Sequence, residues 1–221
     1  KLKGHYLDTK HPIIMENLLG IKRAKGSNQR SKKPLLINDL KLLIDAIDQS
    51  KQNEKRKIRD KAIILIGFSG GFRRSELVNV EVEDIEFVHE GAKIFIKRSK
   101  TDQSGEGMTK AIPYFDNKKY CPILSLKEWI VNSQIKNGRI FSISDKSVAL
   151  IIKKYASLSG LDSSRYGGHS LRSGFATSTA ESGAEERNIM AMTGHKTTQM
   201  VRRYIQEANL FKNNALNKIK I

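Results

Sequence analysis

Three short segments of this 221-residue chain carry side chains that could act on a phosphate ester. GGFRRSEL places Arg73 just after two glycines, and GGHSLRSGFA places Arg172 three residues after His169. TGHKTTQMVRRY ends on Tyr204, nine residues after His195. Attack of an oxygen nucleophile on a phosphodiester builds negative charge on the non-bridging oxygens, which the charged, planar fork of a guanidinium group can bind two at a time. The segments therefore supply a candidate nucleophile and candidate phosphate ligands.

Each segment taken alone has a commoner structural explanation. A histidine three residues before an arginine is usually an ordinary surface pair about one helical turn apart. A tyrosine on a helix usually packs in part against the core, and an arginine near a glycine is usually solvated. The functional prediction therefore depends on the order and spacing of all three segments.

In that order, the segments resemble the catalytic domain of the tyrosine recombinase, or phage integrase, family over residues 35 to about 215. The family motif Gly-x-Arg-x-x-Glu-Leu matches GFRRSEL. The resemblance makes Arg73 the first catalytic arginine and Glu76 an acidic residue that supports the site. The family's His-x-x-Arg box matches His169 and Arg172.

The third family box is a Gly-His pair with the nucleophilic tyrosine nine residues later, which matches His195 and Tyr204. The interval of 23 residues between the second arginine and His195 is also typical of the family. A lysine in a β-hairpin completes the family's set. RSKT makes Lys100 the best match, with Lys97 and Lys110 as alternatives close by.

The resemblance implies a reaction without metal, nucleotide or other cofactor. Tyr204 would attack a scissile DNA phosphate and form a 3′-phosphotyrosyl bond, releasing a 5′-hydroxyl. Because that bond preserves the energy of the phosphodiester, a second 5′-hydroxyl can reverse the step. His169 would take the phenol proton, and Lys100 would protonate the leaving oxygen. The sequence shows neither a carboxylate cluster of the kind that holds Mg²⁺ nor a P-loop.

Three further residues would hold the phosphate in such a reaction, and a fourth would support them. Arg73 and Arg172 would bind its non-bridging oxygens, and His195 would donate a further hydrogen bond to one of them. Glu76 would fix one of these cationic or imidazole groups without touching DNA.

The charge of the chain favours a polyanionic partner. Its 40 Lys and Arg against 23 Asp and Glu give a net charge of +17 and a pI near 9.9. A smaller excess would be explained by solubility alone, but a field of this size favours nucleic acid. The resemblance implies that this nucleic acid is double-stranded DNA, bound by a homotetramer, with a monomer possible in its absence.

The sequence predicts a protein of the bacterial cytoplasm, encoded by a bacterium or phage and acting on nucleoid, phage or plasmid DNA. Cys121 is the only cysteine, so no intramolecular disulfide can form, and a reducing compartment is expected. The longest apolar run, AIILIGF at 62–68, is far shorter than a bilayer span, and no signal-like stretch opens the chain.

Hydrophobic periodicity predicts an α+β, mostly α-helical fold with a small three-stranded antiparallel sheet. Asn38 is a plausible cap for a helix through INDLKLLIDAIDQ. Strands are expected at IEFV, AKIFIKR and TKAIPYF, with HEG and DQSGEG as turns. Helices are expected at 12–23, 37–49, through 62–68, at 74–80, 121–134, 145–160, 171–182, 185–192 and 197–206.

Two domains are expected. Residues 1–34 are rich in Lys and Arg and include a linker-like stretch. The resemblance implies that they are the end of a missing N-terminal core-binding domain followed by a basic linker, and that residues 35–221 form the catalytic domain. Its last stretch, about 207–221, resembles the segment that family members pass to a neighbouring subunit, although packing onto its own domain is a close alternative.

Two other functions fit part of the sequence. A type IB topoisomerase shares the Arg, Lys, Arg, His, Tyr chemistry and relaxes supercoils without exchanging partners, but GHSLRSGFA and TGH are more typical of recombinases. A DNA-binding module without catalysis would also be basic and helical. The complete catalytic set argues against such a module.

Overall fold

The computed structural model describes residues 8–26, 32–97, 105–195, 197–209 and 215–219. The chain divides into two compact units, Lys1–Ser31 and Lys32–Ile221. In the first, helix α1 (Pro12–Lys25) forms where the sequence predicted one, with Pro12 at its start and basic residues in its last turn. None of the residues of α1 is buried.

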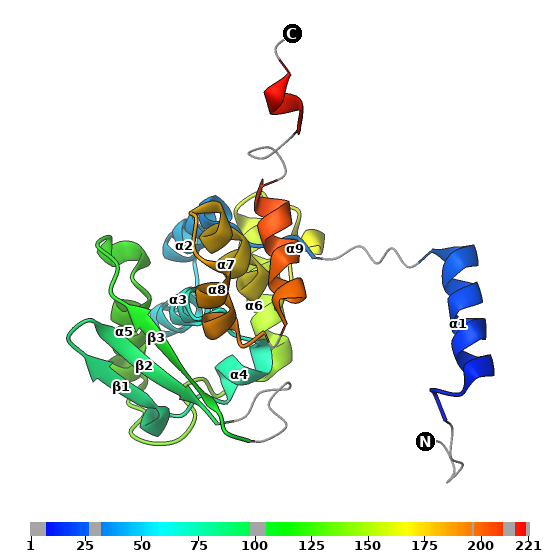
Figure 1. Cartoon of the computed structure of the whole chain (residues 1–221). Coiled ribbons are helices and arrows are strands. Elements are labelled where there is room, and N and C mark those ends of the chain that lie inside the picture. The colour runs from blue at the N-terminus through cyan, green and yellow to red at the C-terminus, as the bar shows by residue number, and fades with distance from the viewer. Residues whose placement is uncertain (1–7, 27–31, 98–104, 196, 210–214, 220–221) are drawn as a thin grey trace. The chain divides into compact units, whose positions relative to one another are not determined.

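The second unit is mostly helical, as the sequence predicted (Figure 1). Its α-helices are α2 (Ile37–Gln49), α3 (Glu54–Ser69), α4 (Arg74–Val78), α5 (Pro122–Ser133), α6 (Asp145–Leu158), α7 (Ser170–Glu181), α8 (Glu186–Thr193) and α9 (Thr198–Asn209). Short 3₁₀ helices, which the sequence did not predict, are η1 (Val82–Asp84), η2 (Lys118–Tyr120), η3 (Ser163–Arg165) and η4 (Ala215–Lys218). In the part of the chain that the structure describes, no helix is long and apolar enough to cross a membrane.

The predicted three-stranded antiparallel sheet is also present. Its strands are β1 (Ile85–Val88), β2 (Gly91–Ile96) and β3 (Met108–Pro113), in the order β1-β2-β3. Ile94 of β2 pairs with Ile85 on one side and with Lys110 on the other. Side chains alternate between a buried and an exposed face, as a sheet covered on one face requires.

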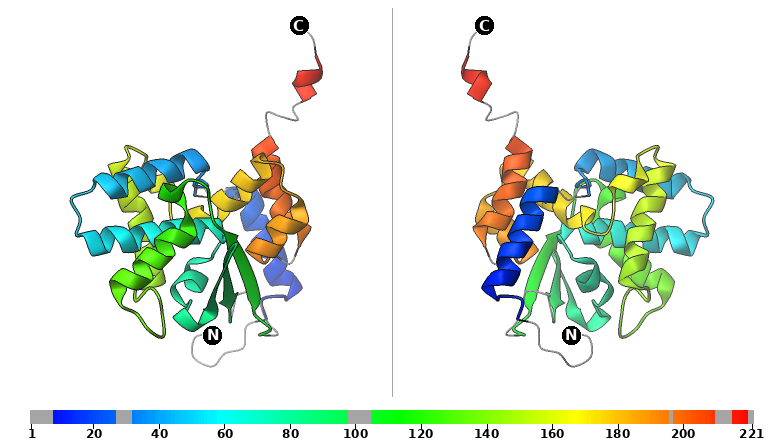
Figure 2. Two further views of the ribbon diagram at one scale, coloured as in Figure 1. Left: turned by 90° about the vertical axis from the view of Figure 1, so that its left-hand side faces the viewer. Right: turned by 90° about the vertical axis from the view of Figure 1, so that its right-hand side faces the viewer.

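Helix α3 is the centre of the core. The predicted buried run AIILIGF lies in its second half, where residues 62–66 have no exposed surface. Gly67 allows close packing on α7, since a Cβ there would lie 2.7 Å from a methyl group of Leu171. Phe68 meets Phe175 of α7 edge to face, with 6.5 Å between the ring centroids. Figure 2 shows α8 and α9 on one side of β3 and the bundle of α2, α3 and α5 on the other.

The segment before α2 is paired with the segment that leads into α7. The backbone N–H of Lys33 donates to the carbonyl of Arg165 (2.7 Å), and that of Leu35 donates to Ser170 (2.9 Å). At Gly174 a Cβ would lie 2.0 Å from the carbonyl oxygen of Leu35, so only glycine fits there.

The predicted cap at Asn38 is wrong. Helix α2 begins at Ile37, and Leu36 precedes it without a side-chain cap, so Asn38 lies inside the first turn. A tertiary contact determines where the helix starts. The hydrogen bond between Leu35 and Ser170 holds the chain extended up to Leu36, and the helix begins directly after it.

Candidate active site

Two glycines end α3 and turn the chain towards Arg73. Gly71 has φ +55°, and a Cβ there would lie 2.9 Å from the ring of Phe175, so the turn needs glycine for its conformation and for space. Arg73 then precedes α4, and its Nη1 donates to Oε1 of Glu76 over 2.5 Å. The Arg73 backbone N–H donates to the other carboxylate oxygen over 3.0 Å.

This carboxylate is buried, with 3% of the Glu76 surface exposed. Burial acts to raise the pKa of Glu76, but the two hydrogen bonds from Arg73, with the charge of Lys110, lower it overall. Glu76 is therefore ionised and holds Arg73 by its backbone and its guanidinium at once.

Arg172 lies in the first turn of α7 and is 1% exposed. Its Nη1 donates to the carbonyl oxygen of Gly71 over 2.9 Å, whereas Nη2 is buried without a hydrogen-bond partner among the residues that the structure describes. Burial and the charge of Arg73 lower the pKa of Arg172 to about 10, so it remains charged at pH 7. A buried, charged donor without an acceptor is costly, and an anion would satisfy it.

His169, directly before α7, faces the predicted nucleophile. Its Nε2 lies 3.3 Å from the Tyr204 hydroxyl of α9. The tyrosine is half-buried against the small apolar cluster of Ala176, Ile189 and Val201. Burial and the nearby arginines lower the pKa of His169, which favours the neutral imidazole at pH 7. A neutral imidazole at this distance can accept the phenol proton.

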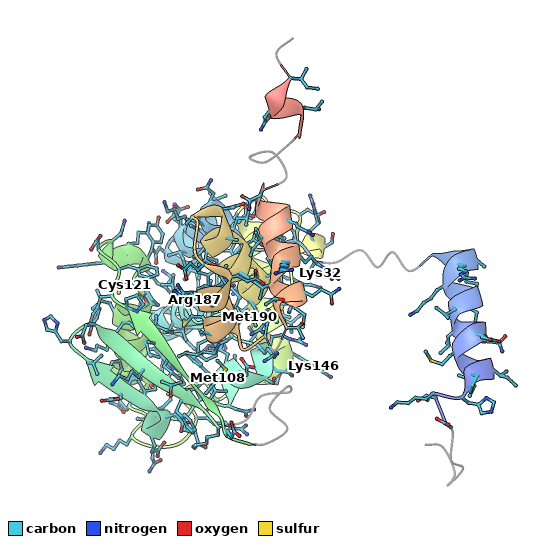
Figure 3. The ribbon with its side chains drawn as sticks, viewed as in Figure 1. Lys32, Met108, Cys121, Lys146, Arg187 and Met190 are labelled. Carbon is cyan, nitrogen blue, oxygen red and sulfur yellow. The ribbon has the colours of Figure 1, made fainter. Side chains whose placement is uncertain are left out.

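His195 follows α8 and is almost fully buried, at 7% exposure. Gly194 ends α8 in the left-handed conformation (φ +64°), and a Cβ there would lie 2.9 Å from the sulfur of Met108 in β3, which Figure 3 labels. The His195 ring lies 5.9 Å from that of Tyr204 between centroids. Burial and the charges of Arg172 and Arg73 lower the pKa of His195 to about 4, so the ring carries one N–H at pH 7.

Thr193 determines which nitrogen of His195 carries that proton. Its Oγ1 lies 2.8 Å from His195 Nδ1 and 2.6 Å from the carbonyl oxygen of Ile189. The hydroxyl has a single hydrogen, so it donates to one of the two. When it donates to Nδ1, Nε2 carries the proton and can donate to a ligand oxygen. Sequence reasoning missed this role of Thr193, although its place directly before the Gly-His pair was a signal.

Of the three hairpin lysines that the sequence offered, the structure describes two, and these differ in their surroundings. Lys100 lies outside the described residues. Lys97 is about half exposed and pairs with Glu81 and with Asp84 (3.0 Å). These hydrogen bonds raise the pKa of Lys97 to about 12, which makes it a poor proton donor. Lys110 is fully buried below the site.

The structure thus gathers most of the predicted site from separate parts of the chain. The shared hydrogen bonds, the ring contact between His195 and Tyr204 and the mutual electrostatic effects place the described members in one cluster. They are Arg73, Glu76, His169, Arg172, His195 and Tyr204.

A helical domain with a small antiparallel sheet and a tyrosine next to arginine and histidine side chains defines a recognisable class of protein. Residues 34–210 match the model of the phage integrase family. The chain belongs to the phage integrase family.

Similar proteins include an integrase/recombinase xerD homolog of Selenomonas ruminantium, 44% identical over 98% of this chain and 66% of that protein. Tyrosine recombinase XerC of Syntrophus aciditrophicus is 31% identical over 66% of this chain and 48% of its own length. The chain spans about half to two thirds of the length of these relatives.

Solved structures share the fold. The XerH site-specific recombinase in a post-cleavage complex with difH DNA superposes with a TM-score of 0.71 at 19% identity, covering 85% of this chain and 53% of that one. A lambda integrase dimer bound to a COC′ core site superposes with a TM-score of 0.58 at 18% identity, covering 95% of this chain and 60% of that one.

Proposed function

We propose that this chain is the catalytic part of a site-specific DNA recombinase or integrase that cleaves and rejoins strands through a 3′-phosphotyrosyl intermediate, in integration or excision. The observation that carries the proposal is the Tyr204 hydroxyl 3.3 Å from His169 Nε2, in one cluster with Arg172, whose buried Nη2 has no partner among the described residues. Family membership supports it, and so does similarity to an integrase/recombinase homolog. The same proposal places the protein in a bacterial cytoplasm, encoded by the chromosome, a phage or another mobile element.

The phosphate would bind between the two arginines. Arg172 Nη2 would donate to one non-bridging oxygen, and Arg73, held by Glu76, would bind the other. His195 would add a hydrogen bond from Nε2, with Thr193 donating to Nδ1. The two guanidinium groups are held by Glu76 and by the Gly71 carbonyl before the reaction begins, so they stabilise the charge that develops on the phosphate with little reorganisation.

Two proton transfers would accompany cleavage, one from Tyr204 to His169 and one from Lys100 to the leaving oxygen. The Tyr204 oxygen attacks phosphorus while its proton passes to His169, and the bond from phosphorus to the 5′-oxygen breaks. Lys100 gives that oxygen a proton, so a 5′-hydroxyl leaves. In the second half, a 5′-hydroxyl attacks the phosphotyrosine and restores the tyrosine and an intact strand.

The direct test is covalent trapping. The purified protein is mixed with nicked duplexes taken from the DNA that flanks its own gene, and the products are separated on a denaturing gel. We expect a protein–DNA adduct and, with paired sites, recombinant strands. Absence of any adduct on DNA that the protein binds would instead establish a binding module, and relaxation of supercoils without recombinants would establish a topoisomerase.

Replacement of Lys100 by alanine is expected to slow adduct formation about 10²- to 10⁴-fold, because the leaving oxygen then departs without an acid. A 5′-bridging phosphorothiolate, whose leaving group needs no acid, is expected to restore the rate. Single-turnover trapping on the two substrates measures this. Lys97→Ala serves as the matched control, and failure of the phosphorothiolate to rescue Lys100→Ala would move the acid to another lysine.

We also propose that the protein acts on DNA as a homotetramer in which residues 210–221 of one subunit bind a neighbour. An apolar cavity of about 700 Å³, lined among others by Phe68, Phe115, Phe175 and Met192, is the acceptor. The segment LFKNNALNKIKI supplies apolar side chains at helical spacing, of which Leu216 is 67% exposed and Ile219 59% exposed. Residues 1–34 would be the end of a core-binding domain joined by a basic linker.

Deletion of residues 210–221 is expected to abolish tetramers on DNA while a single subunit still forms an adduct. The same loss is expected for Phe115→Glu, which places a charge in the cavity. Sedimentation of the protein with paired sites measures assembly. Val131→Glu is the control, since Val131 is a 74% exposed apolar residue on α5 that does not line the cavity. Undiminished tetramers after the deletion would rule out the exchange.

A further inference from the structure

A lysine lies at the bottom of the candidate active site, where an apolar residue would be expected. Lys110 occupies β3 on the same face as Ile112 and pairs in register with Ile94, both of which are buried. Its own side chain is 0% exposed. Lysine is almost never fully buried unless its ammonium group has partners.

Those partners belong to the turn after α3 and to the last turn of α8. Lys110 Nζ donates to the carbonyl oxygen of Gly70 over 2.8 Å and to that of Met192. It also lies over the ring of Phe72, 5.0 Å from its centroid. Gly70 and Met192 are on the backbone stretches that lead to the predicted phosphate ligands at positions 73 and 195, three residues further on in each case.

The turn held by Lys110 also holds the second arginine. Gly70 gives its carbonyl to Lys110, and Gly71 gives the next carbonyl to Arg172 Nη1. Two cations thus bind consecutive carbonyls of one tight turn. A shift of that turn would displace Arg73 and Arg172 together.

The surroundings of Lys110 disfavour the charged form of its side chain. Burial acts first to lower the pKa of Lys110, the carboxylate of Glu76 in α4 opposes this, and the charges of Arg172 in α7 and Arg73 lower the pKa further, to about 8. His195, from the loop after α8, is neutral at this pH. Replacing the lysine by an apolar residue would remove the repulsion but leave two carbonyls without their donor.

We propose that Lys110 is a positioning residue that locks the turn after α3 to the C-terminal end of α8, so that Arg73, Arg172 and His195 converge on one phosphate. The inference rests on the proposed function. It separates Lys110 from the proton donor of the reaction, because its ammonium is buried and two of its three N–H groups are directed at backbone carbonyls. A displacement of about 1 Å in such a site can cost about 10²-fold in rate.

The test compares Lys110→Met with Lys93→Met, a matched control that removes a half-exposed lysine on the opposite face of the same sheet. Adduct formation is followed in single turnovers at saturating DNA, on nicked substrates with a normal oxygen and with a 5′-bridging phosphorothiolate. We expect Lys110→Met to react about 10- to 100-fold more slowly on both substrates. Lys93→Met should match the wild type.

Each other outcome has a definite meaning. Rescue of Lys110→Met by the phosphorothiolate would make Lys110 the acid and overturn the positioning role, and an unchanged rate on both substrates would overturn it too. If the wild type forms no adduct, the proposed function itself fails.

The pH dependence of the wild type gives a measurement that does not require the variant to fold. On the phosphorothiolate no acid is needed, so loss of the Lys100 proton has no effect. Lys110 is charged below about pH 8 and loses its proton above it. The rate at limiting DNA, which reports the protonation state of the free protein, is therefore expected to fall above about pH 8, and this falling limb should be absent in Lys110→Met if that variant folds. A wild-type rate that stays level to about pH 9.5 would overturn the proposal.

Discussion

Replacement of Tyr204 by phenylalanine is expected to abolish covalent attachment to DNA while leaving DNA binding unchanged. The change removes only the hydroxyl that lies 3.3 Å from His169, and the ring can keep its packing against Val201 and Ile189. A phenyl ring has no oxygen with which to attack phosphorus, so we expect adduct formation to be lost completely and not merely slowed.

Two assays on one nicked substrate separate the effects of Tyr204→Phe. Gel retardation measures binding, and a denaturing gel measures adduct. Tyr114→Phe is the control. It removes a hydroxyl directly after β3 that accepts a hydrogen bond from Lys127 of α5 and takes no part in the site. An adduct formed by Tyr204→Phe at the wild-type rate would mean that another residue is the nucleophile.

Replacement of Arg172 by lysine is expected to slow adduct formation about 10³- to 10⁵-fold, roughly 4 to 7 kcal/mol in the barrier. The lysine keeps the charge and can donate to the carbonyl of Gly71, but it cannot also present the second, in-plane donor that Nη2 supplies. The effect should therefore appear in the rate at saturating DNA more than in binding.

Single-turnover trapping over a range of DNA concentrations separates rate from binding for Arg172→Lys. Arg74→Lys is the matched control, because Arg74 is 40% exposed and its nearest carboxylate, Asp145, is 3.8 Å away. A rate for Arg172→Lys within about tenfold of the wild type would show that Nη2 does not contact the phosphate in the transition state.

Much of the fold could be predicted from periodicity. The second half of α3 is an uninterrupted apolar run, and a double glycine ends it, so the element and its end are both visible in the sequence. Alternation gave the three strands to within two residues. The start of α2 was misplaced because a hydrogen bond from Leu35 to Ser170, 135 positions along the chain, decides it. No local pattern encodes such a contact.

The candidate site was predictable as a set of residues but not as a set of contacts. Spacing selected the arginines, histidines and tyrosine, whereas the carbonyl of Gly71 that holds Arg172 is a backbone group with no signature of its own. Lys110 did carry a signal, since it interrupts the apolar face of an alternating strand. It was weighed only as a proton donor, because its burial and its two carbonyl partners depend on how β3 packs against the distant ends of α3 and α8.

The pairing between the segment that precedes α2 and the start of α7 gives the molecule a mechanical property. The backbones of Lys33 and Leu35 are hydrogen-bonded to the segment that leads into α7. Gly174 of α7 packs directly against the backbone of Leu35, with no space between them for a side chain. Tension on the chain ahead of Lys32 would therefore be transmitted directly to the helix that carries Arg172. In the proposed function, a core-binding domain joined through residues 1–34 would in this way act on the position of Arg172.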